Sequence, residues 1–159
     1  MTRSFLTVSA LTFALLLLVS LPQLADPLIR FDDFPAFFGD EHLFYEKTLS
    51  EGRWLNYWWI ARPFIWSPTV NFMIYQLAWA IFAAAAAVNA LGPGARPLHT
   101  IALAALIALS PQAFLISGWF NTLILGAWVV ALYAVISLYV SGRTARWLFL
   151  IFAPVSMMA

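Results

Sequence analysis

The stretch from Asp26 to Arg62, DPLIRFDDFPAFFGDEHLFYEKTLSEGRWLNYWWIAR, separates a long apolar N-terminal run from the apolar sequence that follows it. It holds all seven carboxylates of the 159-residue chain, four of its eight Lys and Arg residues and one of its two His residues. Chemistry that needs proton transfer, metal ligation or phosphate binding is therefore concentrated in this one charged segment.

The rest of the chain has the composition of a membrane protein. Hydrophobic residues make up 64% of the sequence, only 9% is charged, and the mean hydropathy is +0.87, whereas soluble proteins carry about 25% charged residues. We therefore predict an all-α integral membrane protein, a polytopic helix bundle. The cations form no basic face, so no nucleic-acid partner is expected. The absence of cysteine excludes disulfides and thiolate metal sites.

Four apolar runs are long enough to cross a bilayer, which takes about 20 residues. The predicted spans cover residues 4–25, 69–91, 98–116 and 122–140, with an external loop at 26–67. The alternative for the first run is a cleaved signal peptide. Its length exceeds the usual apolar region of about 7 to 15 residues, and Gln23-Leu24-Ala25 is a poor cleavage site, so an uncleaved span closed by Pro22 and Pro27 is favoured.

Several residues within the predicted spans shape their packing. The second span carries the polar side chains Asn71, Gln76 and Asn89, and its alanine tract at 83–87 permits close helix packing. Pro111 interrupts the third span, so we expect that span to be bent or partly unwound where its backbone faces a cavity. The turn to the fourth span is expected at 117–121.

A fifth apolar run, residues 147–159, is too short to cross a membrane. It is predicted to be a partial span. We therefore expect residues 1–159 to form a single transmembrane domain that is the N-terminal part of a longer protein, or one that a partner completes.

The cations outside the charged segment indicate the orientation. Arg3, Arg96, Arg143 and Arg146 fall on one side when the spans alternate. The positive-inside rule then places the N-terminus in the cytoplasm and the charged segment outside. In a bacterium this corresponds to the inner membrane, with the charged segment in the periplasm.

The charged segment itself is predicted to be structured. A short helix is expected at 41–51, with one or two short helices lying along the membrane surface as far as Ile60. The aromatic residues that follow this helix are typical of the headgroup level. They are Trp54, Tyr57, Trp58, Trp59 and Trp66.

Two kinds of residue in the segment could carry chemistry. Asp32 and Asp33 can act as a general base and a metal ligand or orienting group, although the plainer interpretation is a solvated acidic turn. Lys47, Arg53 and Arg62 could bind a phosphate, or pair with neighbouring acids. Asp40 and Glu41 are explained by helix capping, and His42 has no partners for a zinc site.

In combination these features resemble a known family. A first span, an external Asp32-Asp33 pair and a helix ending in Gly52-Arg53-Trp54-Leu55 are similar to the start of GT-C-type membrane glycosyltransferases, in particular the bacterial glucosyltransferases of O-antigen modification. The resemblance covers residues 31–59 and continues later only in topology. Ser110-Pro111-Gln112 and Trp119-Phe120-Asn121 also resemble a later external loop, where the family would have Asp in place of Asn121.

The resemblance implies transfer of a sugar from a polyprenyl-phosphate donor to a cell-envelope glycan or lipid-linked acceptor at the outer membrane face. Asp33 or Asp32 would be the catalytic base, and Arg53, with Lys47 and Arg62, would bind the donor. The acid pair would suit Mg²⁺ or Mn²⁺, although one loop offers too few ligands to require a metal. Grooves beside the alanine-rich second span or the bent third span would hold the lipid tail.

Two other classes of function compete with this prediction. One is a fragment of a transporter or lipid flippase, which the absence of ionisable residues inside the spans disfavours. The other is a non-enzymatic membrane subunit whose aromatic segment binds a partner.

Overall fold

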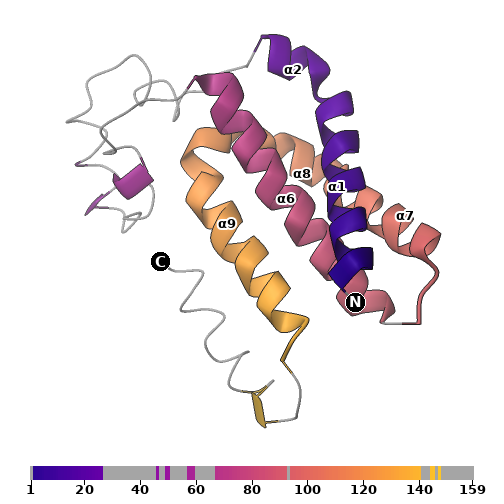
Figure 1. The fold of residues 1–159 in the computed structure, drawn as a ribbon. Coiled ribbons are helices and arrows are strands. Elements are labelled where there is room, and N and C mark those ends of the chain that lie inside the picture. The colour runs from indigo at the N-terminus through magenta and orange to yellow at the C-terminus, as the bar shows by residue number, and fades with distance from the viewer. Residues whose placement is uncertain are drawn as a thin grey trace.

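The computed structural model describes residues 2–26, 46, 49–50, 57–59, 67–92, 94–140, 144–145 and 147, and within these it is entirely helical (Figure 1). The elements are α1 (Thr2–Val19), α2 (Leu21–Ala25), α6 (Pro68–Leu91), α7 (Pro97–Ala108), α8 (Pro111–Ile116), the 3₁₀ turn η1 (Ser117–Trp119) and α9 (Phe120–Ser137).

Helix α6 is the centre of the bundle and packs against α1, α2, α7 and α9 (Figure 1). Its alanines are the contact surface, since Ala80, Ala83, Ala84, Ala85 and Ala87 are all fully buried. Two clusters form along this surface, one joining Ala84 and Ala87 to Val8 and Ala104, the other joining Ala80 and Ala83 to Leu16 and Ala108. The small side chains let the neighbouring backbones approach closely, as the alanine tract predicts.

Both ends of α6 are fixed by local sequence. Pro68 occupies its first turn, where a missing N–H costs nothing, and the Ser67 hydroxyl accepts a hydrogen bond from the Val70 N–H at 3.3 Å. At the other end Gly92 adopts a φ of +76°, which strongly favours glycine. The predicted second span, 69–91, is therefore confirmed as a helix.

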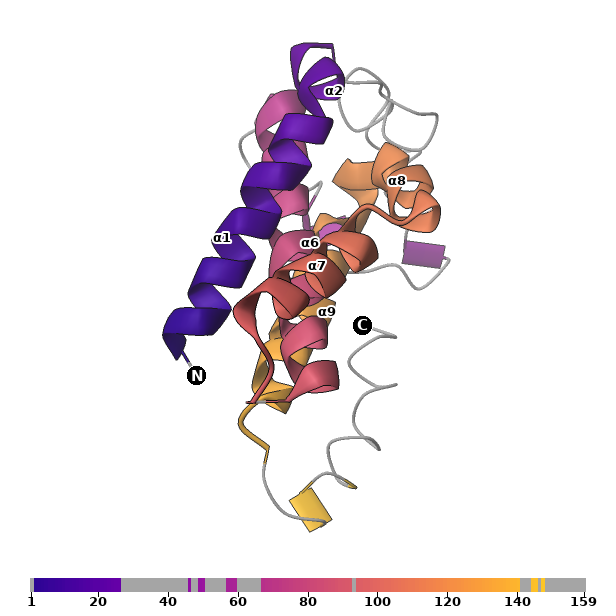
Figure 2. The same cartoon turned by 90° about the vertical axis from the view of Figure 1, so that its right-hand side faces the viewer.

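The chain reverses direction between successive long helices, so its connections gather at two ends of the bundle (Figures 1 and 2). The start of α1 and the connection from α6 to α7 lie at one end. Arg3, in the first turn of α1, and Arg96, at the N-cap of α7, therefore share this end, as predicted. Arg143 and Arg146 lie outside the described residues. The opposite end carries α2, the start of α6 and η1.

The predicted first span is not one helix from 4 to 25. Helix α1 ends at Val19, the chain turns at Ser20, and α2 begins at Leu21. The cause is Pro22, which has no N–H to donate to the carbonyl of Leu18 and so breaks the ladder of hydrogen bonds. Helix α1 therefore ends at Val19, whereas the predicted span continued to residue 25.

The third predicted span, 98–116, is broken into α7 and α8 at Leu109 and Ser110. The interruption at Pro111 was predicted. The turn expected at 117–121 is replaced by the 3₁₀ helix η1, which joins α8 to α9, and α9 starts at Phe120 rather than Thr122.

Two helical segments in the described residues are long and apolar enough to cross a membrane, judged by length and composition. They are Pro68–Leu91 and Pro111–Ser137, the second running from α8 through η1 into α9. Ser4–Val19 and Pro97–Ala108 are apolar but shorter. The four predicted spans are therefore reproduced only in part: Pro22 ends the first early, and Pro111 separates the third into α7 and α8, of which α8 continues through η1 into α9. The partial fifth run lies outside the described residues except for Trp147.

The predicted surface helices fall largely outside the described residues. Glu46, Leu49 and Ser50 are helical, as are residues 57–59, which agrees with helices in this segment at the positions that are described. Trp58 is 59% exposed, while Trp59 is half-buried.

The described helices expose many large apolar side chains and bury several polar ones. Large apolar side chains cover the outside, among them Leu6 and Leu18 on α1, Leu98 and Leu106 on α7, and Leu132 on α9. The buried residues include small or polar ones from every long helix, listed here: Ser9, Thr12, Asn71, Gln76, Thr100, Asn121 and Thr122.

Candidate functional site

The charged segment leaves and rejoins the bundle at one point. Asp26 ends α2, where its N–H donates to the Pro22 carbonyl at 3.0 Å, and Ser67 caps α6. The hydroxyl of Thr69 donates to the Leu24 carbonyl at 3.4 Å, so the two sides of the segment are in contact. All seven carboxylates of the chain belong to this segment in the sequence, and of these the structure describes Asp26 and Glu46.

The residues predicted to carry chemistry lie within this segment. Asp32, Asp33, Lys47, Arg53 and Arg62 are all outside the described residues, so their roles stay predictions. Within the described part of the chain, no group of three or more His, Cys, Asp or Glu side chains gathers to hold a metal ion.

A buried amide cluster lies at the same end of the bundle. The Asn71 side chain of α6 donates from Nδ2 to Oδ1 of Asn121, at the start of α9, over 2.8 Å. The indole Nε1 of Trp59 donates to the same oxygen over 3.1 Å. Asn71 is fully buried and Asn121 is 2% exposed. One oxygen thus ties the aromatic part of the charged segment to both long helices of the bundle.

Apolar packing holds the amide cluster in place. Phe72 and Phe120, each next to one of the two asparagines, meet edge to face with ring centroids 5.3 Å apart. With Tyr75 and Ile124 they form a buried cluster against which Trp59 also packs. Water is excluded, so the hydrogen bonds to Asn121 act in a medium of low dielectric, where they are strengthened.

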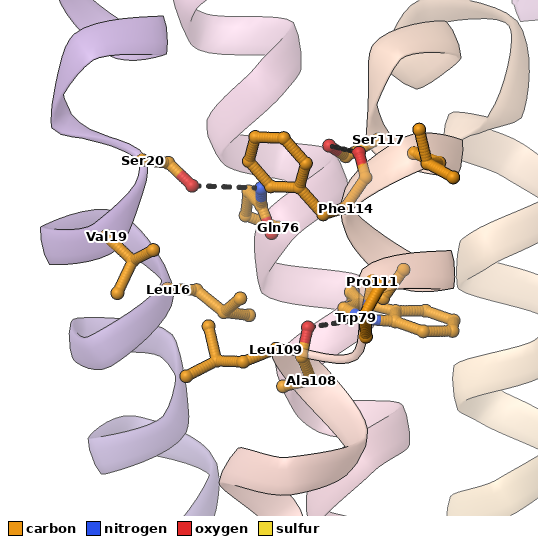
Figure 3. A pocket seen from close by; sticks show the side chains of 12 residues that line it. Leu16, Val19, Ser20, Gln76, Trp79, Ala108, Leu109, Pro111, Phe114 and Ser117 are labelled. Carbon is orange, nitrogen blue, oxygen red and sulfur yellow. Dashed lines mark hydrogen bonds between the residues drawn. The ribbon is translucent and has the colours of Figure 1, made fainter.

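A pocket of about 470 Å³ opens where the third span is broken (Figure 3). Its walls come from the end of α1, the middle of α6, the end of α7 and the whole of α8. The lining is mostly apolar, and none of the lining residues is charged. Gln76 and Trp79 of α6 form part of the wall, and the lipid-tail grooves expected beside the second and third spans stay predictions.

The break that makes the pocket is stabilised by side chains. Pro111 ends the helical ladder, so the Ala108 carbonyl cannot receive the Gln112 N–H that a continuous helix would supply. It accepts instead from the Trp79 indole Nε1 at 3.3 Å. The Trp79 ring is held by stacking on Phe82, with centroids 5.0 Å apart. The Ser110 hydroxyl caps the start of α8 by accepting from the Ala113 N–H at 3.2 Å.

The pocket has a polar end and an apolar end (Figure 3). Gln76 Nε2 donates to the Ser20 hydroxyl at 3.4 Å, and the Ser117 hydroxyl donates to the Phe114 carbonyl at 2.7 Å. These three side chains lie toward the charged segment. Leu16, Leu109, Pro111 and the Trp79 ring line the opposite part.

Sequence reasoning did not find either the amide cluster or the polar end of the pocket. It noted Asn71 and Gln76 as polar residues in a span and Asn121 as the place of a missing acid. A polar side chain within an apolar span is itself the signal for an interhelical contact. Which helix it meets depends on the bends at Ser20 and Pro111, which periodicity does not encode.

No protein-family model matches the chain, and no curated protein and no solved structure is similar enough to count as a match. Its function is therefore inferred from its own residues.

Proposed function

We propose that the bundle is embedded in a membrane, with the charged segment on the outer face. The two long apolar helices support this placement by length and composition. The many large apolar side chains on the exterior, together with buried polar residues such as Asn71 and Gln76, support it further, because a water-soluble bundle would expose its polar residues. Arg3 and Arg96 at the other end of the bundle favour a cytoplasmic N-terminus, in a bacterium at the inner membrane.

Within that placement, the chain is proposed to act as a glycosyltransferase, or as the N-terminal part of one. It would transfer a sugar from a polyprenyl-phosphate donor to a glycan or lipid-linked acceptor. The observation that carries this proposal is the grouping of every carboxylate of the chain in the one segment that joins α2 to α6. The Asp32-Asp33 and Gly52-Arg53 motifs supply the resemblance.

The mechanism assigns a separate task to each charge. Asp33, or Asp32, accepts the proton of the acceptor hydroxyl, whose oxygen attacks the anomeric carbon as the bond from that carbon to the phosphate oxygen breaks. The leaving polyprenyl phosphate takes the electron pair, and Arg53, with Lys47 and Arg62, balances its charge. A divalent Mg²⁺ or Mn²⁺ would find hard oxygen ligands at Asp32 and Asp33.

The test compares two conservative substitutions in the full-length protein. Asp33→Asn keeps the size of the side chain but removes the base, so turnover of a polyprenyl-phosphate sugar should fall by roughly 10²-fold or more while donor binding survives. The matched control is Asp40→Asn, because Asn caps a helix nearly as well as Asp and activity should be unchanged. If the control abolished transfer and Asp33→Asn did not, the two roles would have to be exchanged.

Arg53→Ala should behave differently from Asp33→Asn. A charge-assisted contact to phosphate acts in both the ground state and the transition state, so its loss should weaken donor binding as well as slow transfer. Donor binding is measured apart from turnover with the sugar-free polyprenyl phosphate. An unchanged affinity would remove Arg53 from the site.

The broken third span favours a second candidate, a transporter or lipid flippase, because discontinuous helices mark the binding sites of many transporters. The uncharged lining of the pocket disfavours coupling to an ion. Flux of a lipid across vesicles without any transfer of sugar would support this candidate against the first.

A further inference from the structure

The pocket at the broken third span has the features of a site for one lipid chain. Three of the residues that line it are large apolar side chains with much of their surface exposed: Val19 at 49%, Phe114 at 55% and Leu115 at 59%. A cavity for a water-soluble ligand would open among polar residues. This one opens onto the apolar exterior that the proposed membrane placement puts in contact with lipid.

The size of the pocket suits a single hydrocarbon chain. Its volume of about 470 Å³ lies within the range of roughly 300 to 1,000 Å³ that is usual for small-molecule sites. At about 30 Å³ for each water-sized group, it has room for roughly fifteen methylenes. Leu16, Leu109, Pro111 and the Trp79 ring provide the apolar walls (Figure 3).

The polar side chains Ser20 and Gln76 determine which chemical group of a ligand can bind at that end of the pocket. Ser20 and Gln76 are 4% and 3% exposed, and their mutual contact of 3.4 Å is a long hydrogen bond. In that contact the Ser20 hydroxyl accepts, so its own hydrogen and the second amide hydrogen of Gln76 are left to donate. Two uncharged donors side by side match a carbonyl oxygen.

A phosphate fits this end poorly, because no lining residue carries a positive charge and burying an unpaired charge is costly. Ser20 lies at the turn between α1 and α2, six residues before the charged segment begins at Asp26.

We infer that this pocket binds one acyl chain of a glycerolipid, with the chain between Leu16 and Trp79 and its ester carbonyl at Ser20 and Gln76. The inference requires the proposed membrane placement but not sugar transfer. A chain inactive as a transferase would still bind the lipid, and an active one could lack this site.

The experiment uses phosphatidylethanolamine that carries a diazirine in one acyl chain. After irradiation of the purified protein in detergent, mass spectrometry should locate the label on residues 16–20 and 108–117. Unlabelled diester phosphatidylethanolamine should compete roughly three- to tenfold better than its diether analogue, which lacks the carbonyl and so loses one neutral hydrogen bond. Polyprenyl phosphate should compete no better than the diether.

Substitutions connect this preference to the pocket. Gln76→Leu keeps the volume of the side chain but removes the amide donors and leaves only the Ser20 hydroxyl, so it should reduce the preference for ester over ether while labelling persists. Asn89→Leu is the matched control, since Asn89 also bonds from α6 to another helix, at Ser137, but does not line the pocket. It should keep the preference.

Three results would overturn the inference. The first is label spread equally over the exposed Leu132 and Ile136 of α9. The second is equal competition by the diester and the diether against the unsubstituted protein. The third is stronger competition by polyprenyl phosphate, which would make the pocket the tail site of the proposed donor.

Discussion

The Oδ1 atom of Asn121 accepts hydrogen bonds from two parts of the chain that are far apart in sequence. Asn71 donates from α6 and Trp59 from the charged segment. The resemblance to glycosyltransferases would put an acid at this position in an external loop. The structure places an amide there, buried in the first turn of α9, where it joins elements together.

Asn121→Ala should therefore lower the free energy of unfolding in detergent by about 1 to 3 kcal/mol, because it deprives two donors in a dry environment of their acceptor. Asn89→Ala is the control. Asn89 also bonds to a neighbouring helix but is exposed, so water can replace its partner, and the loss should stay below about 1 kcal/mol. Equal losses in the two variants would contradict a buried role for Asn121.

At the scale of the element, the break between α7 and α8 deprives the Ala108 carbonyl of its usual helical donor, the Gln112 N–H, and the Trp79 indole replaces that donor. Pro111 ends the helix, so no backbone N–H donates to the Ala108 carbonyl at this point, and the indole N–H of Trp79 on α6 donates to it instead. The effects of Trp79 and Pro111 on the free energy of unfolding are therefore expected to be coupled.

A double-mutant cycle of Trp79→Phe and Pro111→Ala measures that coupling. Alone, Trp79→Phe should cost about 1 kcal/mol for the lost hydrogen bond, besides its change in packing. In the Pro111→Ala background the Gln112 N–H can reach the Ala108 carbonyl. Trp79→Phe should then lose no net hydrogen bond, and only its packing cost should remain. The coupling would then be about 1 kcal/mol.

Phe82→Leu serves as the comparison for this cycle. It removes the ring that stacks on Trp79 but no hydrogen bond, so its cost should simply add to that of Pro111→Ala. Additive costs for Trp79→Phe as well would show that Ala108 does not depend on the indole.

These elements also show which features of the fold can be predicted from the sequence alone. Composition and run length predict helices, the extent of α6 and the interruption at Pro111, because these depend on local hydrophobicity and on missing N–H groups. The turn at Ser20 was not predicted, although Pro22 explains it. The Asn71 to Asn121 contact and the polar end of the pocket depend on how bent helices meet, which no local pattern encodes. The candidate acids and cations themselves stay predictions.

At the scale of the whole molecule, the described helices expose large apolar side chains and bury several polar ones, which supports the proposed membrane placement. Leu98 and Leu106 are 73% and 72% exposed, while Asn71 and Thr12 are buried almost completely. In lipid, apolar side chains gain little from being buried, so packing of small residues and interhelical hydrogen bonds hold the helices together instead.

The orientation can be tested with single cysteines, since the chain has none of its own. With the charged segment outside, Ser50→Cys should react with an impermeant maleimide in intact cells, and Thr144→Cys only after permeabilisation. Both positions are exposed. Ala84→Cys, at a fully buried position, should react only after denaturation.

The opposite pattern, with Thr144→Cys labelled in intact cells and Ser50→Cys protected, would reverse the orientation. It would also place the acids on the cytoplasmic side, away from a donor at the outer face.

The contact between Thr69 and Leu24 makes the charged segment an insert. Because its two ends already meet, the bundle does not depend on its length, and doubling a flexible loop costs only about 0.6 kcal/mol in closure entropy. The segment could therefore be lengthened, shortened or exchanged while α1, α6 and α9 keep their packing, provided that the contacts of Trp59 with Asn121 and with the cluster around Phe72 are kept. In evolution, or at the bench, such a bundle can acquire a new chemistry by replacing one insert, with Asn121 as the point at which each replacement would have to dock.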